Sequence, residues 1–319
     1  MTAERKFQQG KLPLLTVVGP TAVGKTDISI QLAQKLNGEI VSADSVQVYR
    51  YLDIGSAKPS LVERKGVPHH LIDVVDPDVN FTVYDYQTLA KEYIDEIYER
   101  GKLPILTGGT GLYIKAVLDK YNFSSGKVNP LIRKRLEEEC EEKGKEYLYG
   151  ILKKVDPIST KRIHPNDIRR IMRALEFYYL TGEPISLQWE LTKKKSSDYN
   201  TLMVGITMNR KFLYEKINNR VDQMVENGLV KEVEGLLERG YKSNLKSMQS
   251  LGYNHIIKYL QEQYDWETAM QEFKRDTRRY AKRQLTWFRA DERVIWYESA
   301  EQRNINPILD SICFKIEGY

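Results

Sequence analysis

The chain is 319 residues long, a length that suits one large domain or two smaller ones. Hydrophobic residues make up 41% and charged residues 29%, as in a soluble globular protein, and no apolar run approaches the roughly 20 residues that cross a bilayer. The net charge of +5 is weak evidence for an anionic partner, and two isolated cysteines, Cys140 and Cys313, argue against a zinc site or a disulfide framework.

The first predicted element is a strand over residues 14–18, a short apolar run rich in β-branched residues. The basic segment before it runs straight into this strand and does not have the form of a signal peptide, so we expect a cytoplasmic protein without a membrane segment. A Gly-containing turn follows, then a helix that Asn37 and Gly38 end, and then a strand over 39–43. This order of elements favours a parallel sheet.

The next predicted helix spans residues 83–100 and has a regular apolar stripe. Thr82 and Asp85 form a capping-box pattern at its start. A buried strand over 103–107 then runs into GGTGLY, residues 108–113, and a further helix.

Strand patterns disappear from about residue 121, and charged helical patterns continue to about residue 200. A strand pattern then returns over 201–208. We therefore predict an α/β fold, a parallel-sheet core interrupted by an all-helical insertion. The predicted parts are core 1–120, insertion 121–200 and core 201–319.

The last part of the chain is mostly helical. One helix ends near Gly228, a second spans 229–238, and a long basic helix covers 266–289. A final strand is predicted over 294–297.

GPTAVGKT, residues 19–26, fits the P-loop pattern G-x-x-x-x-G-K-[ST] in full, with a strand before it and a helix after it. The glycines let backbone N–H groups converge on phosphate oxygens, and the helix start adds its positive dipole end. The residues expected to bind phosphate are Gly19, Pro20, Thr21, Ala22, Val23, Gly24, Lys25 and Thr26. The core is therefore expected to be a P-loop core.

The loop does not identify the phosphate compound. ATP or GTP is the usual ligand, but a hydrolase also needs a catalytic carboxylate and a positioned water, and a kinase needs a second substrate pocket. The diphosphate of an isoprenoid suits the loop equally well.

Asp44 and Thr110 follow two of the predicted strands, and ligands of open parallel sheets bind beyond the carboxyl ends of strands. Asp44 is interpreted as a water-mediated Mg²⁺ ligand, as a general base or as a simple turn residue. Thr110 is interpreted as a ligand-binding hydroxyl or as a helix cap. The residues alone leave these roles open.

Seven segments carry a resemblance to a known family, and in chain order they are GPTAVGKT (19–26), DSVQVYRYLDIGSAKP (44–59), VPHHLID (67–73), GGTGLYIKA (108–116), RIHPND (162–167), RRIMRALE (169–176) and TRRYAKRQLTWFR (277–289). Together they resemble the tRNA dimethylallyltransferases, also called isopentenyl-tRNA transferases. They cover nearly the whole chain in the expected order. The sequence is similar to the bacterial form, since it shows no zinc finger of the kind that eukaryotic members often carry at the C-terminus.

The resemblance implies a reaction and roles for particular residues. The loop would bind dimethylallyl diphosphate with Mg²⁺, for which Thr26 is the expected ligand. Asp44 would be the general base that takes a proton from N6 of adenosine 37 in tRNA. Thr110 would contact the bridging oxygen of the leaving diphosphate, and Arg220 would contact the diphosphate too. The dimethylallyl group would pass to that N6, and diphosphate would be released.

Basic residues also indicate RNA binding, because cations and aromatics alternate along the helix 266–289 and more cations gather in the insertion. By resemblance, residues 44–47 and 249–254 contact the extruded adenine and its neighbours. The residues expected at tRNA are Asp44, Ser45, Val46, Gln47, Arg133, Arg169, Arg170, Arg173, Gln249, Gly252, Arg278, Arg279, Lys282, Arg283 and Gln284. A monomer is the expected assembly.

Three other functions fit parts of the pattern. An adenylate isopentenyltransferase, which acts on free AMP, ADP or ATP, would share the loop and Asp44 but needs neither the insertion nor the basic helix. A P-loop kinase or NTPase would act on a nucleotide without a prenyl donor. An RNA-binding module with a degenerate loop would not require the intact Lys25 and Thr26.

Overall fold

The computed structural model describes residues 11–119, 129–193, 197–299 and 305–317. The chain divides into two compact units. One unit contains Met1–Val117 and Asp198–Tyr319, and the other contains Leu118–Ser197. The chain therefore leaves the first unit, forms the second, and returns to complete the first.

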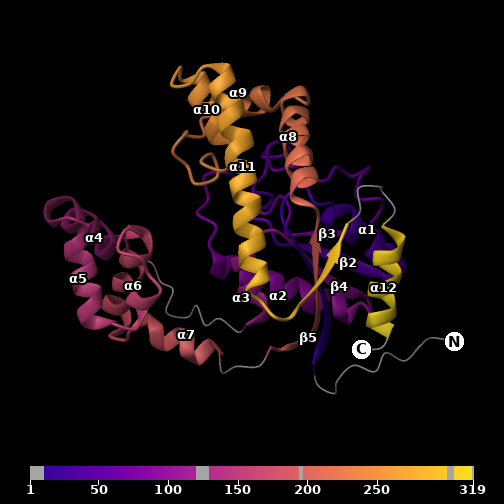
Figure 1. The fold of residues 1–319 in the computed structure, drawn as a ribbon, viewed down its shortest axis with the longest axis horizontal. Coiled ribbons are helices and arrows are strands. Elements are labelled where there is room, and N and C mark those ends of the chain that lie inside the picture. The colour runs from indigo at the N-terminus through magenta and orange to yellow at the C-terminus, as the bar shows by residue number, and fades with distance from the viewer. Residues whose placement is uncertain (1–10, 120–128, 194–196, 300–304, 318–319) are drawn as a thin grey trace. The chain divides into compact units, whose positions relative to one another are not determined.

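A parallel sheet organises the first unit, and its described strands lie in the order β3-β2-β4-β1-β5-β6. Figure 1 draws these strands as arrows. They are β1 Leu12–Val18, β2 Gly38–Ser42, β3 His69–His70, β4 Leu103–Gly108, β5 Tyr199–Thr207 and β6 Val294–Glu298. Each neighbouring pair is parallel, and Leu15 of β1 lies opposite Ile105 of β4 and Leu202 of β5. The central position of β1 explains its nearly continuous apolar sequence.

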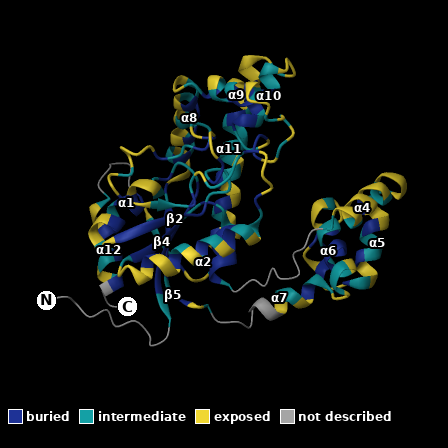
Figure 2. Ribbon diagram, turned by 180° about the vertical axis from the view of Figure 1, so that it is seen from behind, coloured by how far each residue is buried: buried dark blue, intermediate teal, exposed yellow. Residues whose placement is uncertain are grey.

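Helices cover both faces of this sheet. Leu15 and Val17 join an apolar cluster with α1 (Lys25–Leu36) and α12 (Asn306–Glu317), so these helices lie on one face. α2 (Val83–Glu99) packs against β2 and β4, on the opposite face that a right-handed return crossover requires. Figure 2 shows β2 and β4 as buried strands between these layers.

Local sequence signals set the helix ends. Asn37 adopts a left-handed conformation with φ 50° and ends α1, and its N–H donates to the carbonyl of Ala33. At the start of α2, the Thr82 hydroxyl accepts the N–H of Asp85 while the Asp85 carboxylate accepts the N–H of Thr82. The predicted capping box is confirmed.

The other helices of this unit are α3 Gly111–Leu118, α8 Arg210–Glu226, α9 Leu229–Glu238, α10 Tyr253–Leu260 and α11 Trp266–Arg289. α11 has the bounds predicted for the long basic helix, and Asp265 caps it by accepting the Thr268 N–H at 2.7 Å. Three of the described elements of this unit were not predicted from the sequence, namely β3, α10 and α12. β3 has only two residues and α10 only eight, too few to show a clear periodicity.

All the regular secondary structure in the described residues of the second unit is helical. Its elements are α4 Pro130–Lys143, α5 Lys145–Val155, a 3-10 helix Ser159–Lys161, α6 Ile168–Thr181 and α7 Ile185–Lys193. They share a separate apolar core of Leu136, Leu148, Leu152, Ile163, Ile171, Ala174 and Leu175. The predicted fold class, a parallel α/β core with an all-helical insertion, is confirmed. Within the described ranges, no helix combines the length and apolarity that crossing a membrane requires.

Candidate active site

Three predicted binding segments lie at one edge of the sheet. Residues 19–26 follow β1, residues 44–47 lie just beyond β2, and residues 109–111 follow β4. These strands are neighbours in the order β2-β4-β1 and run parallel. Their carboxyl ends therefore meet at the edge where open α/β sheets bind ligands.

The phosphate loop has the backbone that its glycines predict. φ is 148° at Gly19, 65° at Ala22 and 98° at Gly24. A Cβ on Gly19 would lie 2.5 Å from the carbonyl oxygen of Ile206, so the close approach to β5 requires glycine. α1 begins at Lys25, directly after the loop, and contributes its free N–H groups. The loop therefore has the geometry of an anion-binding backbone nest.

Charged side chains from α1, from α8 and from the loop after β2 lie beside the phosphate loop. Lys25 is half-buried, and its Nζ donates to the carbonyl of Pro20 at 2.7 Å. Burial, and secondly the charge of Arg220, lower the pKa of Lys25 to about 7, against an opposing effect of Asp44. Burial also lowers the pKa of Arg220, and Asp44 again acts in the opposite direction. Lys25 of α1, Arg220 of α8 and Asp44 therefore belong to one electrostatic site.

Asp44 is held in a fixed orientation. Its Oδ1 accepts the N–H groups of Val46 at 2.8 Å and Gln47 at 3.3 Å, so the residue forms a turn. Its Oδ2 has no hydrogen-bond partner among the residues that the structure describes. One oxygen thus orients the side chain, and the other remains for a proton.

Thr110 joins the turn after β4 to the segment of Asp44. Its Oγ1 accepts the N–H of Ser45 at 3.1 Å and donates to the Ser45 hydroxyl at 3.4 Å. The Thr110 N–H donates to the carbonyl of Ala43 at 3.1 Å. The structure therefore brings Thr110 against the residues on both sides of Asp44.

Gln284 of α11 connects the phosphate loop to the turn after β4. Its side chain is buried, accepts the N–H of Thr21 at 2.9 Å and donates to the carbonyl of Gly109 at 3.0 Å. Gln284 was predicted to contact tRNA. In the structure its side chain is buried, and its amide already bridges two parts of the site. Its position indicates that it supports the loop.

Sequence reasoning missed Tyr280 and Trp287, which lie on the same face of α11 as Gln284. Burial, and secondly the charge of Asp44, raise the pKa of Tyr280 to about 12, while hydrogen bonds with Thr110 and Gln284 lower it. Trp287 approaches Gly111 so closely that a Cβ there would lie 2.2 Å from the indole. The helical spacing of these three side chains was visible in the sequence, but the turn that they face was not.

The other α11 residues predicted at tRNA differ in their availability. Arg279, Lys282 and Arg283 are exposed. Arg278 is half-buried and donates to Asn218 Oδ1 at 2.7 Å. Arg279 Nη1 donates to Asp276 Oδ1 at 3.3 Å, whereas Lys282 and Arg283 stay available for a phosphate backbone.

The segment Ser45 to Gln47 lies half-buried beside Asp44. The Gln47 amide donates to the carbonyls of Ser56 at 3.4 Å and Ala57 at 3.3 Å, and accepts the Ser42 hydroxyl at 3.1 Å. Its side chain therefore orders the loop that follows Asp44, and its contact with tRNA stays a prediction.

Gln249 and Gly252 lie before α10. Gln249 is exposed, and its amide donates to the carbonyl of Ser243 at 2.7 Å. Gly252 is buried with φ 87°, and a Cβ there would lie 2.9 Å from Phe273. A residue with a side chain would therefore be strained at position 252, and the contact of Gly252 with tRNA stays a prediction.

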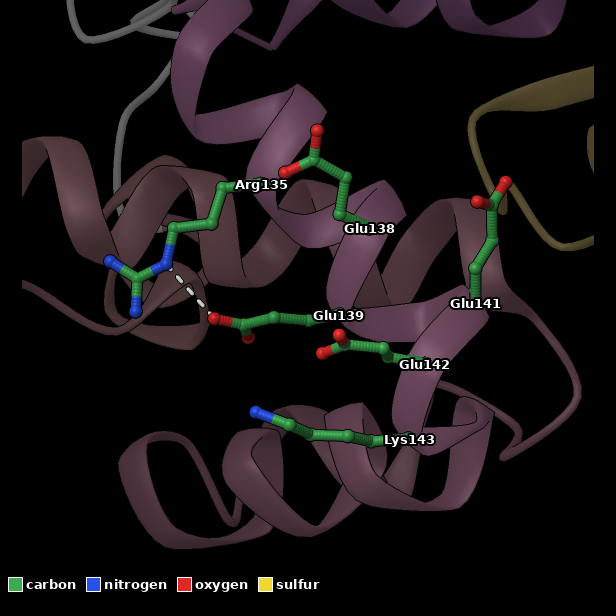
Figure 3. A pocket seen from close by; sticks show the side chains of 6 residues that line it. All are labelled: Arg135, Glu138, Glu139, Glu141, Glu142 and Lys143. Carbon is green, nitrogen blue, oxygen red and sulfur yellow. Dashed lines mark hydrogen bonds and ion pairs between the residues drawn. The ribbon is translucent and has the colours of Figure 1, made fainter.

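In the helical unit, the cations of α4 are paired with carboxylates. Arg133, Lys134 and Arg135 each face a glutamate four residues further along. Figure 3 shows the pair of Arg135 and Glu139, joined at 2.9 Å, in a surface depression. Its lining residues are Arg135, Glu138, Glu139, Glu141, Glu142 and Lys143. This mixed surface attracts a polyanion less than the count of arginines suggests.

The cations of α6 divide differently. Arg169 is exposed, Arg170 pairs with Asp167 at 3.2 Å, and Arg173 pairs with the buried Glu176 at 3.1 Å. Arg169 and Arg170 occupy the first turn, where the helix dipole disfavours positive charge. This placement favours a role in binding an anion over a role in stabilising the helix.

The described residues contain no group of three or more His, Cys, Asp or Glu side chains arranged to hold a metal ion. Thr26, the predicted Mg²⁺ ligand, is exposed in the first turn of α1. The loop therefore offers a hard hydroxyl oxygen and not an all-protein cage, which fits an ion shared with substrate phosphates.

Known proteins resemble the chain over nearly its whole length. A model of the IPP transferase family matches residues 47–291. A tRNA dimethylallyltransferase of Carboxydothermus hydrogenoformans is 50% identical over 91% of this chain and 93% of the relative. A solved tRNA isopentenylpyrophosphate transferase of Bacillus halodurans has a TM-score of 0.72 at 45% identity and covers 97% of this chain and 98% of its own.

A solved eukaryotic dimethylallyltransferase, described as acting on tRNA, has a TM-score of 0.83 at 29% identity over 95% of this chain and 78% of its own. The parallel core, its phosphate loop and the inserted helices thus define a class of transferases with one shared architecture. The chain belongs to the IPP transferase family.

Proposed function

We propose that this enzyme transfers a dimethylallyl group from dimethylallyl diphosphate to N6 of adenosine 37 in tRNA and releases diphosphate. One observation carries the proposal. A phosphate loop and a carboxylate with an unpaired oxygen belong to one site, where the charge of Asp44 acts on the pKa of both Lys25 and Arg220. The names of the relatives support the same activity.

The loop amides, Lys25 and Arg220 bind the diphosphate in this proposal. Thr26 Oγ1 would hold Mg²⁺ together with phosphate oxygens, and the ion would neutralise part of the diphosphate charge. As the allylic C–O bond breaks, negative charge grows on the leaving diphosphate. Lys25 and Arg220 then stabilise the transition state more than the ground state.

The acceptor amine supplies the new bond. N6 of the adenine attacks the allylic carbon, the C–O bond gives its electron pair to the diphosphate, and the N6 proton passes to Asp44 Oδ2. Asp44 Oδ1 stays bound to the N–H groups of Val46 and Gln47, which keeps Oδ2 directed. The base must leave its stack to reach this site, as in other base-modifying enzymes.

The exposed cations Arg279, Lys282 and Arg283 of α11 provide an attachment for the RNA backbone. Gln284, on the same helix, reaches the phosphate loop. A single helix thus connects the proposed RNA surface to the proposed diphosphate site. The expected monomer and the cytoplasmic location are part of this proposal.

The test uses labelled dimethylallyl diphosphate with four acceptors: an unmodified tRNA transcript, the same transcript with guanosine at position 37, AMP, and water. We expect label only in the first transcript. Label in AMP would identify an adenylate isopentenyltransferase instead. Nucleotide hydrolysis without any prenyl transfer would identify a P-loop kinase or NTPase.

A further inference from the structure

A single carboxylate fixes the loop that follows Asp44 to α9. Glu232 Oε2 accepts the N–H groups of Asp53 at 3.1 Å and Ile54 at 2.8 Å, and its Oε1 accepts the N–H of Gly55 at 3.2 Å. Three consecutive backbone donors therefore converge on one side chain. Glu232 lies in the first turn of α9, where the helix dipole also stabilises a negative charge.

α10 reaches the same carboxylate through Tyr253. The Tyr253 hydroxyl donates to Glu232 Oε1 at 2.5 Å. Its buried ring lies against Gly55, where a Cβ would be 2.4 Å from the ring. Because Tyr253 belongs to the segment 249–254, the carboxylate ties this segment to the turn at 53–55. By resemblance, the segment 249–254 is expected near the target base, and the turn at 53–55 belongs to the loop that follows residues 44–47.

Hydrogen bonds continue from the anchored turn to Asp44. Ser56 and Ala57 come directly after it, and their carbonyls accept the Gln47 amide at 3.4 Å and 3.3 Å. The Gln47 N–H donates to Asp44 Oδ1 at 3.3 Å. A displacement of the turn at 53–55 therefore moves the backbone groups that orient Asp44.

We propose that Glu232 is a positioning residue, which holds the Asp44 loop and the segment 249–254 in the arrangement that receives the target nucleotide. The inference rests on the proposed function. The phosphate loop follows β1, and its link to α11 passes through Gln284 and not through Glu232. Loss of the anchor should therefore affect the acceptor side of the reaction and spare diphosphate binding.

The test is Glu232→Gln. The amide keeps one acceptor oxygen but turns an NH₂ group toward N–H or O–H donors, so part of the anchor is lost. We expect kcat to fall about 10²-fold, because a displacement of about 1 Å in the reacting groups can reduce the rate by that factor. The KM for tRNA should rise. Inorganic diphosphate should still bind at one site per chain, with a Kd within about twofold of wild type.

Two variants provide controls. Glu234→Gln changes an exposed carboxylate of the same helix and should leave kcat and both KM values unchanged. Tyr253→Phe keeps the ring over Gly55 and the three backbone bonds to Glu232, so its loss of kcat should be smaller than that of Glu232→Gln.

Hydrogen exchange separates positioning from general destabilisation. In Glu232→Gln, amides of residues 44–57 and 249–254 should exchange faster, while those of the phosphate loop should not. Unchanged kcat, or a fall in kcat matched by fewer diphosphate sites per chain, would overturn the proposal. A wild-type chain inactive on tRNA would instead refute the proposed function, and the exchange data would still show whether Glu232 joins the two segments.

Discussion

Lys25 is the residue whose protonation matters most at the phosphate site. Its pKa of about 7 means that the free enzyme carries a partly neutral amine at physiological pH. An anionic ligand favours the charged form and raises this pKa, so ligand binding takes up a proton.

Diphosphate affinity should therefore decrease as pH rises above 7, by at most about tenfold per pH unit. Lys25→Arg is the matched control, because its guanidinium stays charged throughout this range. Calorimetric titration with inorganic diphosphate between pH 6 and pH 9 measures both proteins, and the ratio of their affinities removes the titration of the ligand itself. A ratio that does not change with pH would contradict the assignment.

Asp44 can be separated from Lys25 by substitution. Asp44→Asn keeps an oxygen for the N–H groups of Val46 and Gln47 but removes the proton acceptor. Its kcat should fall roughly 10²–10⁴-fold while diphosphate affinity is largely kept. Lys25→Ala should lose both activity and diphosphate affinity. Wild-type turnover by Asp44→Asn in the labelled-tRNA assay would exclude Asp44 as the base.

At the scale of elements, α11 has two surfaces with different tasks. Tyr280 and Gln284 face the turn after β4, whereas Lys282 and Arg283 are exposed. The basic residues of the helix predict an RNA surface from the sequence, and this contact stays a prediction. The support that its other face gives to the phosphate loop depends on tertiary packing, which no spacing along the helix reveals.

Gln284→Ala should weaken diphosphate binding by about 1–2 kcal/mol, because the N–H of Thr21 and the carbonyl of Gly109 lose their partner. Lys282→Ala, on the exposed surface, should weaken tRNA binding and leave diphosphate binding unchanged. Measuring both ligands with both variants tests this division. If Gln284→Ala affected tRNA alone, its role would be direct contact.

The difference between local sequence patterns and tertiary packing also explains which other features could be predicted from the sequence. The phosphate loop, the capping box at Thr82 and the bounds of α11 follow from local patterns, and the structure has them at the predicted places. Glu232 looks in the sequence like an ordinary exposed helix residue, because its three backbone partners lie about 180 residues away. Long-range backbone hydrogen bonds leave no signature in a single sequence.

At the scale of the molecule, Glu39 links separate parts of the fold at the opposite end of β2 from Asp44. Its buried carboxylate contacts His70 of β3 at 2.7 Å, Arg100 at 2.7 Å and Lys102 at 2.8 Å. Burial raises the pKa of Glu39, but the hydrogen bonds from Lys102, His70 and Arg100 outweigh it and hold the pKa at about 2.

Because the folded pKa lies below the usual value, this carboxylate stabilises the fold at pH values above about 4.5. The contribution, about 2–3 kcal/mol, should be lost as pH falls from 4.5 toward 2. Glu39→Gln should therefore lower the free energy of unfolding at pH 7, and its difference from wild type should shrink in acid. Glu92→Gln, on the exposed side of α2, is the control, and urea unfolding at several pH values measures all three proteins.

The helical unit Leu118–Ser197 interrupts the connection that carries the chain from β4 across β1 to β5. It has its own apolar core, and the register of β1 with β5 is formed by residues outside it. Evolution can therefore lengthen, shorten or exchange this module while the chemical centre stays intact. The length and surface of this module can then diversify without any rebuilding of the parallel sheet.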